Sequence, residues 1–524
     1  MTPADPLAWR KRAGTALLTF ALLLGVRTSA HAAVEVPIEP SCGPGHVNVR
    51  DFYDGSGDYS TAFARAVSAL PGGGVLTVPA GSHLLRRHVM VNTDGICIKG
   101  DPGARVVVDP VEGDLDINHY AAFIANKPAA SGTGLDAVRN VWVQDLRIEV
   151  RKGVDGPISQ GVVQYNNCRD CGVERSQVVW TGAADIDLKG RSTDGIAFSQ
   201  GSSGWISEVR VDGMPKVGIL MTMGAHDVLI DEVETVNSGA RNGAGGYWGA
   251  GIALGGSSRI TVRSAVSSGN RIAGILVGAV GGGVLGWHPA RDSVITDCTV
   301  SGNGTRSQES AGLIVNSEAF ATDHVDVLPE GVQVDDLRSY ANNGHGIYVS
   351  SGRHVAIRAS TVRDNTDHGI LVANATHGEG RIADLTADVS IQGSYVYRNG
   401  TVLGVHSGSV ALRAVKDVEV RDSVLWGAGQ AGNTLVLMSA LAGAPGPDVR
   451  SSGVRLSGID VRNTLTTWVG GESESGAYDI AGSGSPNAYR GIGLAAPLGS
   501  HYTDTAGGRR YLKTTGSLTA TGWS

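Results

Sequence analysis

A repeated glycine-led triplet is the feature that most constrains the fold of this 524-residue chain. A glycine followed by three mostly aliphatic residues recurs along the middle of the chain. The equal steps between these glycines, such as that from Gly195 to Gly218, define a basic unit of about 23 residues. The longer steps are the same unit with about 10 to 15 inserted residues. The glycines that begin the triplets are Gly195, Gly218, Gly251, Gly274, Gly312, Gly346 and Gly369.

Each unit has the pattern of three short strands separated by turns. In the unit that begins at Gly346, Ile347 and Val349 are two residues apart. Val355 and Ile357 keep the same period, which half-buried strands require. One unit cannot bury its apolar face alone, so successive units must stack as the coils of a solenoid. Leucine-rich repeats need regularly placed Leu and Asn, and propeller blades are about twice as long, so neither fits.

The repeated units resemble the coils of right-handed parallel β-helix proteins of the pectin-lyase-like superfamily. The preceding segment resembles the start of pectate-lyase-like domains in tailspikes and rhamnogalacturonase-like enzymes, with NVRDFYDGSGD at 48–58, an amphipathic helix over Thr61–Leu70, and GGVLTVPAG at 73–81. The resemblance covers residues 46–465 and implies an all-β, right-handed parallel β-helix whose N-terminal helix caps the open end of the solenoid. Residues 497–523 resemble the short β-rich tail of tailspike-like depolymerases, which implies a homotrimer as an alternative to a monomer. A terminal hairpin without a role in assembly is the other interpretation of this tail.

These patterns predict four parts of the chain. Residues 1–32 contain the basic segment Arg10–Arg12, an apolar run and an Ala-His-Ala site, which is typical of a cleaved signal peptide. An N-terminal segment with the capping helix follows over 33–75, and the β-helix itself over 76–465. A Gly/Ser-rich linker and a short β-rich tail are expected over 466–524. We therefore expect a secreted or periplasmic protein without a membrane segment after cleavage; an uncleaved anchor is the alternative.

Charge and resemblance together limit the partners of such a solenoid. The formal net charge of −7 argues against a nucleic-acid binder driven by bulk charge. The resemblance implies a polysaccharide partner, so we expect a polysaccharide lyase or glycoside hydrolase that binds an extended glycan. A non-catalytic carbohydrate-binding or cell-surface β-helix is the alternative, because a fold does not by itself imply catalysis. No motif requires a cofactor, and the resemblance leaves calcium open.

Two short motifs resemble those of polygalacturonases. Ser192–Ile196 (STDGI) is similar to their Asn-Thr-Asp-Gly motif, which makes Asp194 a candidate catalytic acid. Asn343–Ile347 (NGHGI) resembles their Gly-His-Gly motif and contains His345. The second aspartate of that family is replaced here by Pro215–Val217, and the two motifs lie too far apart in sequence. Both motifs are therefore also explained as corners of coils.

The repeat places His345 and His368 together. They are separated by one basic unit without an insertion, so they occupy equivalent corners of adjacent coils, about 5 Å apart. Two stacked imidazoles can act as a base or as sugar ligands near neutral pH. A solvent-facing ladder of polar corner residues is the simpler interpretation. The neighbouring Asp364 and Asp367 either orient the rings or sit in turns.

The outward-facing middle residues of the glycine-led strands carry no charge, so we expect any site on turns and inserted loops. These middle residues are Ala197, Leu220, Ala253, Leu276, Ile314, Tyr348 and Leu371. The inserts at 239–250, 279–292 and 316–330 leave successive coils, and at least two of them are expected to wall a cleft. Aromatic side chains there suit sugars, because a pyranose face presents C–H surface to a ring.

Glu318 is the expected acid or base, with His345 as its partner across a gap of up to about 13 Å. The other catalytic candidates are His368 and Asp194. The expected substrate-binding residues in the inserts are Arg241, Tyr247, Trp248 and Trp287. Lys189 and Arg191 are expected to contact an acidic glycan from a charged cluster with Asp185 and Asp187; a solvated turn is the alternative.

The five cysteines are too few for a disulfide scaffold of this length. Cys168 and Cys171 form a CxxC, but a structural zinc site needs a second pair of ligands, and none is evident. We therefore expect no metal site, and we interpret the pair as buried filler or one local disulfide. At least one thiol stays unpaired within the chain because five is an odd number.

Overall fold

The computed structural model describes part of the chain, and the described residues belong to one compact unit, Pro37–Ser524. The predicted signal peptide at 1–32 lies outside them, so it stays a prediction. The described residues are 40–110, 121–129, 131, 134–151, 160–182, 193–239, 249–281, 287–305, 310–317, 327–374, 386–400, 408–426, 434–439, 451, 453–462, 469–470, 479–482, 485–486, 499–515 and 522–524.

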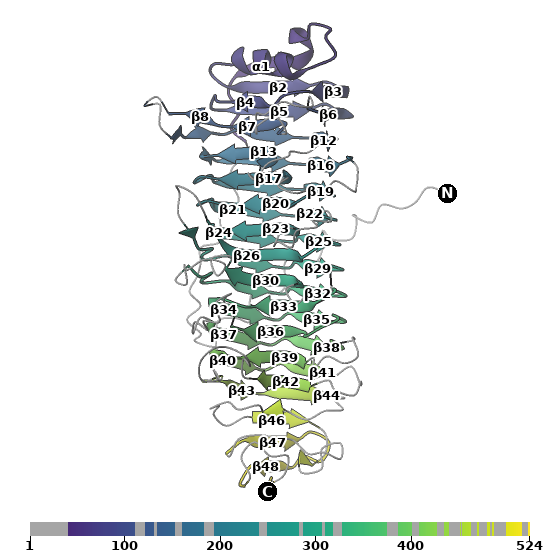
Figure 1. Cartoon of the computed structure of the whole chain (residues 1–524), viewed down its shortest axis with the longest axis vertical. Coiled ribbons are helices and arrows are strands. Elements are labelled where there is room, and N and C mark those ends of the chain that lie inside the picture. Colours follow the sequence, from purple (N-terminus) through teal and green to yellow (C-terminus); the bar gives the residue numbers. More distant parts are fainter. Residues whose placement is uncertain are drawn as a thin grey trace, which may run out of the picture. The chain divides into compact units, whose positions relative to one another are not determined.

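Three long sheets form the walls of a solenoid, and their strands follow one another along the chain in the order A, B, C in each coil (Figure 1). Within each sheet the neighbouring strands belong to successive coils and pair in parallel, apart from the last pair of sheet B. The strands of sheet A are β1 (Gly45–Asn48), β2 (Gly74–Val78), β5 (Ile96–Gly100), β11 (Trp142–Gln144), β15 (Cys171–Glu174), β18 (Gly204–Ser207), β21 (His226–Asp231), β24 (Ser258–Arg263), β28 (Val294–Thr296), β31 (Gln333–Asp335), β34 (Arg353–Arg358), β37 (Ala387–Gln392), β40 (Lys416–Arg421) and β43 (Arg455–Ser457).

Sheet B extends to the C-terminal end of the solenoid, where it closes with an antiparallel hairpin. Its parallel ladder continues past the predicted boundary at residue 465. Its strands are β3 (Gly81–Leu85), β6 (Ala104–Val108), β12 (Arg147–Val150), β16 (Gln177–Trp180), β19 (Arg210–Asp212), β22 (Glu234–Val236), β25 (Val266–Ser268), β29 (Thr299–Ser301), β32 (Arg338–Tyr340), β35 (Thr361–Arg363), β38 (Tyr395–Tyr397), β41 (Val424–Trp426), β44 (Ile459–Arg462), β46 (Asp479–Gly482), β47 (His501–Asp504) and β48 (Arg510–Leu512).

Sheet C contains all seven glycine-led triplets in successive parallel strands, β17 to β36, so the predicted right-handed parallel β-helix with one triplet in each coil is confirmed. Its strands are β4 (Val89–Val91), β7 (Phe123–Ala125), β13 (Gln160–Asn166), β17 (Thr193–Ser199), β20 (Ile219–Met221), β23 (Ala250–Gly255), β26 (Ala273–Gly281), β30 (Ala311–Ser317), β33 (His345–Val349), β36 (Ile370–Ala373), β39 (Gly408–Arg413), β42 (Thr434–Ser439) and β45 (Val469–Gly470). Outside the three sheets lie β8 (Lys127–Pro128) with β9 (Leu135–Asp136), β10 (Val138–Arg139) with β14 (Cys168–Arg169), and β27 (Trp287–His288), which pairs with β26.

A single turn of 3-10 helix, η2 (Val49–Phe52), and a helix, α1 (Ser60–Ser68), lie at the N-terminal end of the solenoid (Figure 1). Phe63 of α1 is fully buried, and its ring lies 5.6 Å from that of Phe123 in β7. The helix therefore covers the end of the apolar interior, as the capping role requires. It begins one residue earlier and ends two residues earlier than the predicted Thr61–Leu70.

A ladder of buried asparagines runs along the corner between sheets B and C, and the sequence analysis missed it. In each step the side-chain amide of one asparagine donates to the side-chain oxygen of the next, over 2.8 to 3.0 Å. Buried amides need such partners, because an unpaired one costs about 1–3 kcal/mol. The ladder consists of Asn270, Asn303, Asn342, Asn365 and Asn399, all nearly or fully buried.

The ladder explains why five of the seven triplets begin with glycine. Gly346 faces the corner, and an added Cβ would lie 2.2 Å from Cγ1 of Val362 and 2.7 Å from Nδ2 of Asn365. Gly312 meets Asn342 in the same way, also at 2.7 Å. From Gly251 onward, the repeated glycine therefore leaves the space that the asparagine ladder occupies, whereas Gly195 and Gly218 lie against the backbone of the next coil and other side chains.

Candidate functional site

Between β3 and β46, the long connections all begin or end at sheet C. Sheets A and B are joined in most coils by two residues, such as 145–146 and 336–337. The first residue of these turns has a positive φ, 55° at Asp145 and 49° at Asp336. By contrast, residues 237–249 lead into β23 and residues 318–332 follow β30. The outer face of sheet C is therefore the face that the insertions flank.

The outer face of sheet C is apolar, as the sequence analysis expected, and it is also buried. Its side chains form a cluster separate from the interior of the solenoid. Leu220, Leu276 and Ile314 are 7%, 6% and 1% exposed, respectively. This face therefore offers little open polar surface for a substrate.

His345 and His368 lie together at the edge of this face where the strands begin. Their rings are stacked, with centroids 5.3 Å apart and planes 9° apart, so the predicted proximity is confirmed. The ring of His345 also lies 5.3 Å from that of Tyr348, the partly exposed middle residue of the same strand. His345 is 6% exposed and His368 is 3% exposed. The two imidazoles are thus clustered and largely enclosed, rather than a solvent-facing ladder.

The two aspartates near the histidines occupy turns. Asp364 has a φ of 56°, and its carboxylate accepts hydrogen bonds from Arg363 and, at 2.8 Å, from Arg398. The backbone N–H of Asp367 donates to the carbonyl of Gly344, 3.0 Å away. The carboxylate of Asp364 is therefore held by two arginines at the sheet B side of the turn.

Asp194 lies in the same sheet as His345 but in a distant coil. It is fully buried, and its Oδ1 accepts a hydrogen bond of 3.1 Å from the backbone N–H of Val217. Five strand steps separate β17 from β33, which corresponds to about 24 Å. The two polygalacturonase-like motifs therefore cannot act on one glycosidic bond, and a role for Asp194 by itself stays a prediction.

Most of the other predicted site residues lie outside the described residues. These are Glu318, Arg241, Tyr247, Trp248, Lys189 and Arg191, with Asp185 and Asp187 of the charged cluster. Trp287 is placed in β27, but only its backbone is described. The insert at 239–250 leads into β23, whereas those at 279–292 and 316–330 follow β26 and β30. Only the last two inserts therefore leave the same edge of sheet C, and the cleft stays a prediction.

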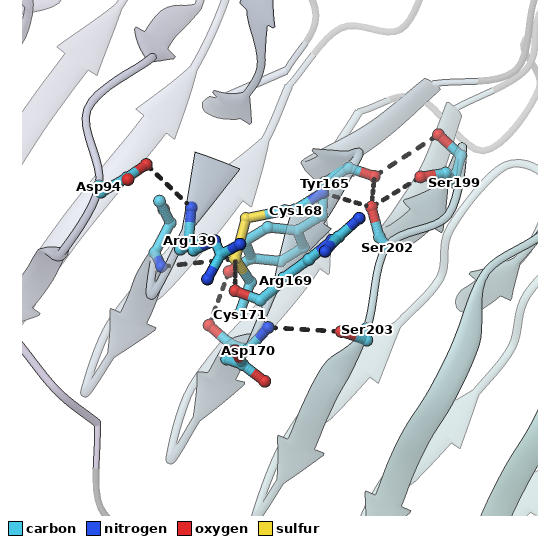
Figure 2. The surroundings of a disulfide bond; sticks show 12 residues. Asp94, Arg139, Tyr165, Cys168, Arg169, Asp170, Cys171, Ser199, Ser202 and Ser203 are labelled. Carbon is cyan, nitrogen blue, oxygen red and sulfur yellow. Dashed lines mark hydrogen bonds between the residues drawn. A yellow bond between two sulfur atoms is a disulfide. The ribbon is translucent and has the colours of Figure 1, made fainter. Parts of the chain in front are cut away.

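The cysteines of the described residues form two disulfides, one between Cys42 and Cys97 and one between Cys168 and Cys171. Figure 2 shows the second, with Ser202 donating through its hydroxyl to Tyr165 and accepting from the backbone N–H of Cys168. Cys298 is free and buried, and burial raises the pKa of its thiol to about 12. The CxxC is thus a local disulfide, one of the two predicted alternatives.

The described residues contain neither a candidate metal site nor a membrane-spanning helix. Among them, no three or more His, Cys, Asp or Glu side chains are grouped so that they could hold a metal ion. No helix in the same part of the chain is long and apolar enough to cross a membrane.

Comparison with known proteins places the chain in a family. The family described as "Right handed beta helix region" matches residues 154–374 and 282–440, so the chain belongs to it. The A-module of the Azotobacter vinelandii mannuronan C-5 epimerase AlgE6 is similar in structure, with 15% identity and a TM-score of 0.50 over 86% of this chain and 99% of that one. The Dettilon tailspike protein (gp208) is similar at 15% identity and a TM-score of 0.50, over 84% of this chain and 69% of that one. No curated protein sequence matches the chain.

Proposed function

We propose that the chain is an exported enzyme that cleaves a uronate-containing polysaccharide, with His345 and His368 at the reacting position. The observation that carries this proposal is the stacked imidazole pair beside Tyr348, on the face that the inserted connections 237–249 and 318–332 flank. Two ionisable rings in contact at the edge of one sheet give a strand-borne, rigid site for proton transfer.

The arrangement supports β-elimination. A neutral imidazole of His345 takes the proton from the carbon beside the uronate carboxylate, and the electron pair forms the new double bond as the bond to the leaving sugar oxygen breaks. The phenol of Tyr348 gives a proton to that oxygen. The ring of His368, when protonated, stabilises the negative charge that develops on the carboxylate. Hydrogen and charge are thereby balanced within the cluster.

Hydrolysis has less support among the described residues. It requires two carboxylates on either side of the glycosidic bond. Asp364 is held by Arg363 and Arg398, and Asp194 lies about 24 Å from His345. Glu318 stays a candidate acid or base. With Glu318 in that role, the reaction would be either hydrolysis or an elimination that the glutamate assists.

Two similar proteins support the class of substrate, and two features of the chain support export. The similar epimerase acts on mannuronan, and the similar tailspike has the same fold. The start of the chain has the pattern of a signal peptide, and two disulfides are typical of proteins that leave the cytosol. Whether the enzyme is a monomer or a homotrimer stays a prediction.

A non-catalytic glycan-binding protein is the second candidate. The low exposure of His345 and His368, together with the apolar outer face of sheet C, favours it. In that case the histidine pair packs the edge of the sheet, and a glycan is held elsewhere on the solenoid.

Incubation of the purified full chain with mannuronan, polygalacturonate and dextran tests the proposal. A lyase gives unsaturated ends that absorb in the ultraviolet, whereas a hydrolase gives reducing ends without that absorbance. His345→Ala and His368→Ala are each expected to lower the rate at least 100-fold with unchanged far-UV circular dichroism. His354→Ala is the matched control, because this histidine is 58% exposed on sheet A beside Glu330 and Asp388. No product from any polymer, or full activity in both histidine variants, would overturn the assignment.

A further inference from the structure

An aromatic face lies on the outer side of sheet B near its C-terminal end. Tyr340, Arg363, Tyr397 and Trp426 are in register in four successive coils. The residues beside them in the same strands, such as Val362 and Val396, belong to the buried interior, so these four side chains face outward. Three strand steps of about 4.8 Å give this column a length of about 14 Å along the solenoid. Tyr395 and Arg398 flank the column, and the six residues define the aromatic face.

The side chains of the aromatic face contact one another along the column. The guanidinium carbon of Arg363 lies 4.6 Å from the ring centroid of Tyr340, and that of Arg398 lies 5.2 Å from the centroid of Tyr397. The rings of Tyr397 and Trp426 are 6.1 Å apart and tilted by 35°. Cation–π contacts of this kind hold flexible arginines in place. The face is therefore ordered by its own contacts.

Two rings of the aromatic face are exposed, whereas the outward-facing tryptophans of sheet A are not. Tyr395 is 53% exposed and Trp426 is 40% exposed. On sheet A, Trp142 and Trp205 also face outward, but their ring centroids lie only 3.8 Å apart. They are 0% and 7% exposed, respectively. Packing explains the tryptophans of sheet A, but it leaves the rings of Tyr395 and Trp426 open to solvent.

The aromatic face carries an excess of positive charge within an acidic chain. Arg363 and Arg398 both bind the single carboxylate of Asp364, so one of their two positive charges is left over. The chain as a whole has a net charge of −7. A linear chain of rings that carries negative charge complements this surface.

We infer that the aromatic face binds an extended anionic polysaccharide, at a site separate from the histidine pair on sheet C. The apolar faces of successive sugar rings lie on Tyr395, Tyr397 and Trp426, and sugar carboxylates are bound by Arg363 and Arg398. The inference depends on the proposed function in one respect only, the chemical class of the ligand. The site holds a long chain on the protein and contains no reacting group.

The form of the surface favours a glycan over a protein partner. Stable protein interfaces bury about 800 Å² on each side around an apolar centre. The large hydrophobic residues that are exposed in the described part of the chain are Val266, Tyr395, Trp426 and Leu512, and only two of these belong to the aromatic face. A narrow column interleaved with arginines fits a thin linear ligand better than a broad partner.

The test is retardation of the full chain in native gels that contain polygalacturonate, mannuronan or dextran. The wild-type chain is expected to be retarded by at least one of the two uronate polymers and not by dextran. The double variant Tyr395→Ala/Trp426→Ala is expected to bind at least tenfold more weakly, and 0.5 M NaCl is expected to weaken the wild-type complex. Val266→Ala is the matched control, because it removes a 42% exposed apolar side chain from the same sheet.

Other results distinguish this inference from the proposed function. Retardation that is unchanged in the double variant, or no retardation by either uronate polymer, would overturn the binding site. A change of oligomeric state in the double variant, measured by analytical ultracentrifugation, would make the face an interface between copies and also overturn it. Retardation that persists in His345→Ala, with no product formed by wild-type protein, would leave the binding site standing and reject the enzyme.

Discussion

The outer faces of sheets C and B are built from the same kind of strand, yet one is closed and the other is open. On sheet C, Ile314 and Leu371 face outward and are 1% and 3% exposed. On sheet B, Tyr395 and Trp426 face outward in the same half of the solenoid and are 53% and 40% exposed. The long connections adjoin both edges of sheet C, whereas the edge of sheet B that follows sheet A has turns of only one to three residues from β3 to β44. In this half of the solenoid, the open face is thus the one that has short turns along one edge.

The largest expected effect is on stability, when the same charge is placed on the closed face and on the open face. Ile314→Asp puts a charge without a partner into the closed face, so it is expected to lower the free energy of unfolding by about 3–5 kcal/mol. Tyr395→Asp places the same group on the open face and is expected to change it by less than about 0.5 kcal/mol. Urea unfolding followed by circular dichroism measures both. Similar losses in the two variants would mean that the faces do not differ.

The corner that joins the two faces is expected to give the next largest effect. Asn342→Ala removes a donor to Asn365 and an acceptor for both N–H groups that Asn303 directs at it. The buried groups that remain are unpaired, so a loss of about 2–4 kcal/mol is expected. Asn343→Ala is the control, because that side chain is exposed and makes one long bond to Gly304. Equal unfolding midpoints for the two variants would argue against the ladder as a source of stability.

The repeat was sufficient to predict the fold and the proximity of His345 and His368, because a coil of fixed length converts sequence spacing into register. The asparagine ladder was also within reach of the sequence, because Asn270, Asn342 and Asn365 each lie four residues before a triplet glycine. Inserted residues hide this spacing for the other two members, Asn303 and Asn399. The burial of the outer face of sheet C could not be predicted, for a physical reason. Alternation shows which side a residue faces, but it does not show what covers that side.

The aromatic face could have been found by counting back from the repeat. Tyr340 and Arg363 both lie six residues before a triplet glycine, Gly346 and Gly369, so their register follows from the coil itself. Tyr397 and Trp426 lie beyond the last triplet, where inserted residues hide the spacing. The exposed rings lie in strands of sheet B, whereas aromatic residues were expected only in the long inserts.

The contrast between closed and open positions is also expected to appear in the pH dependence of stability. Burial lowers the pKa of His83, which is 2% exposed and contacts the carbonyl of Pro79 at 2.8 Å. Below the ordinary pKa of about 6.5, the unfolded chain therefore binds a proton that the folded chain resists, so stability falls as the pH drops. Unfolding midpoints between pH 7.5 and pH 5 are expected to fall less in His83→Gln than in the wild type.

The smallest expected effect concerns a single contact of the open face. Arg363→Lys keeps the charge beside Tyr340 but loses the planar group that lies 4.6 Å from its ring and can bind a carboxylate through two N–H groups. Binding of a uronate polymer is expected to weaken by about two- to fivefold, the size of an exposed cation–π contact, with an unchanged unfolding midpoint. Arg358→Lys is the matched control, because Arg358 pairs with Asp335 on sheet A, away from the aromatic face. Equal affinities for the two lysine variants would mean that only charge matters there, and that ring stacking does not order the arginine for its ligand.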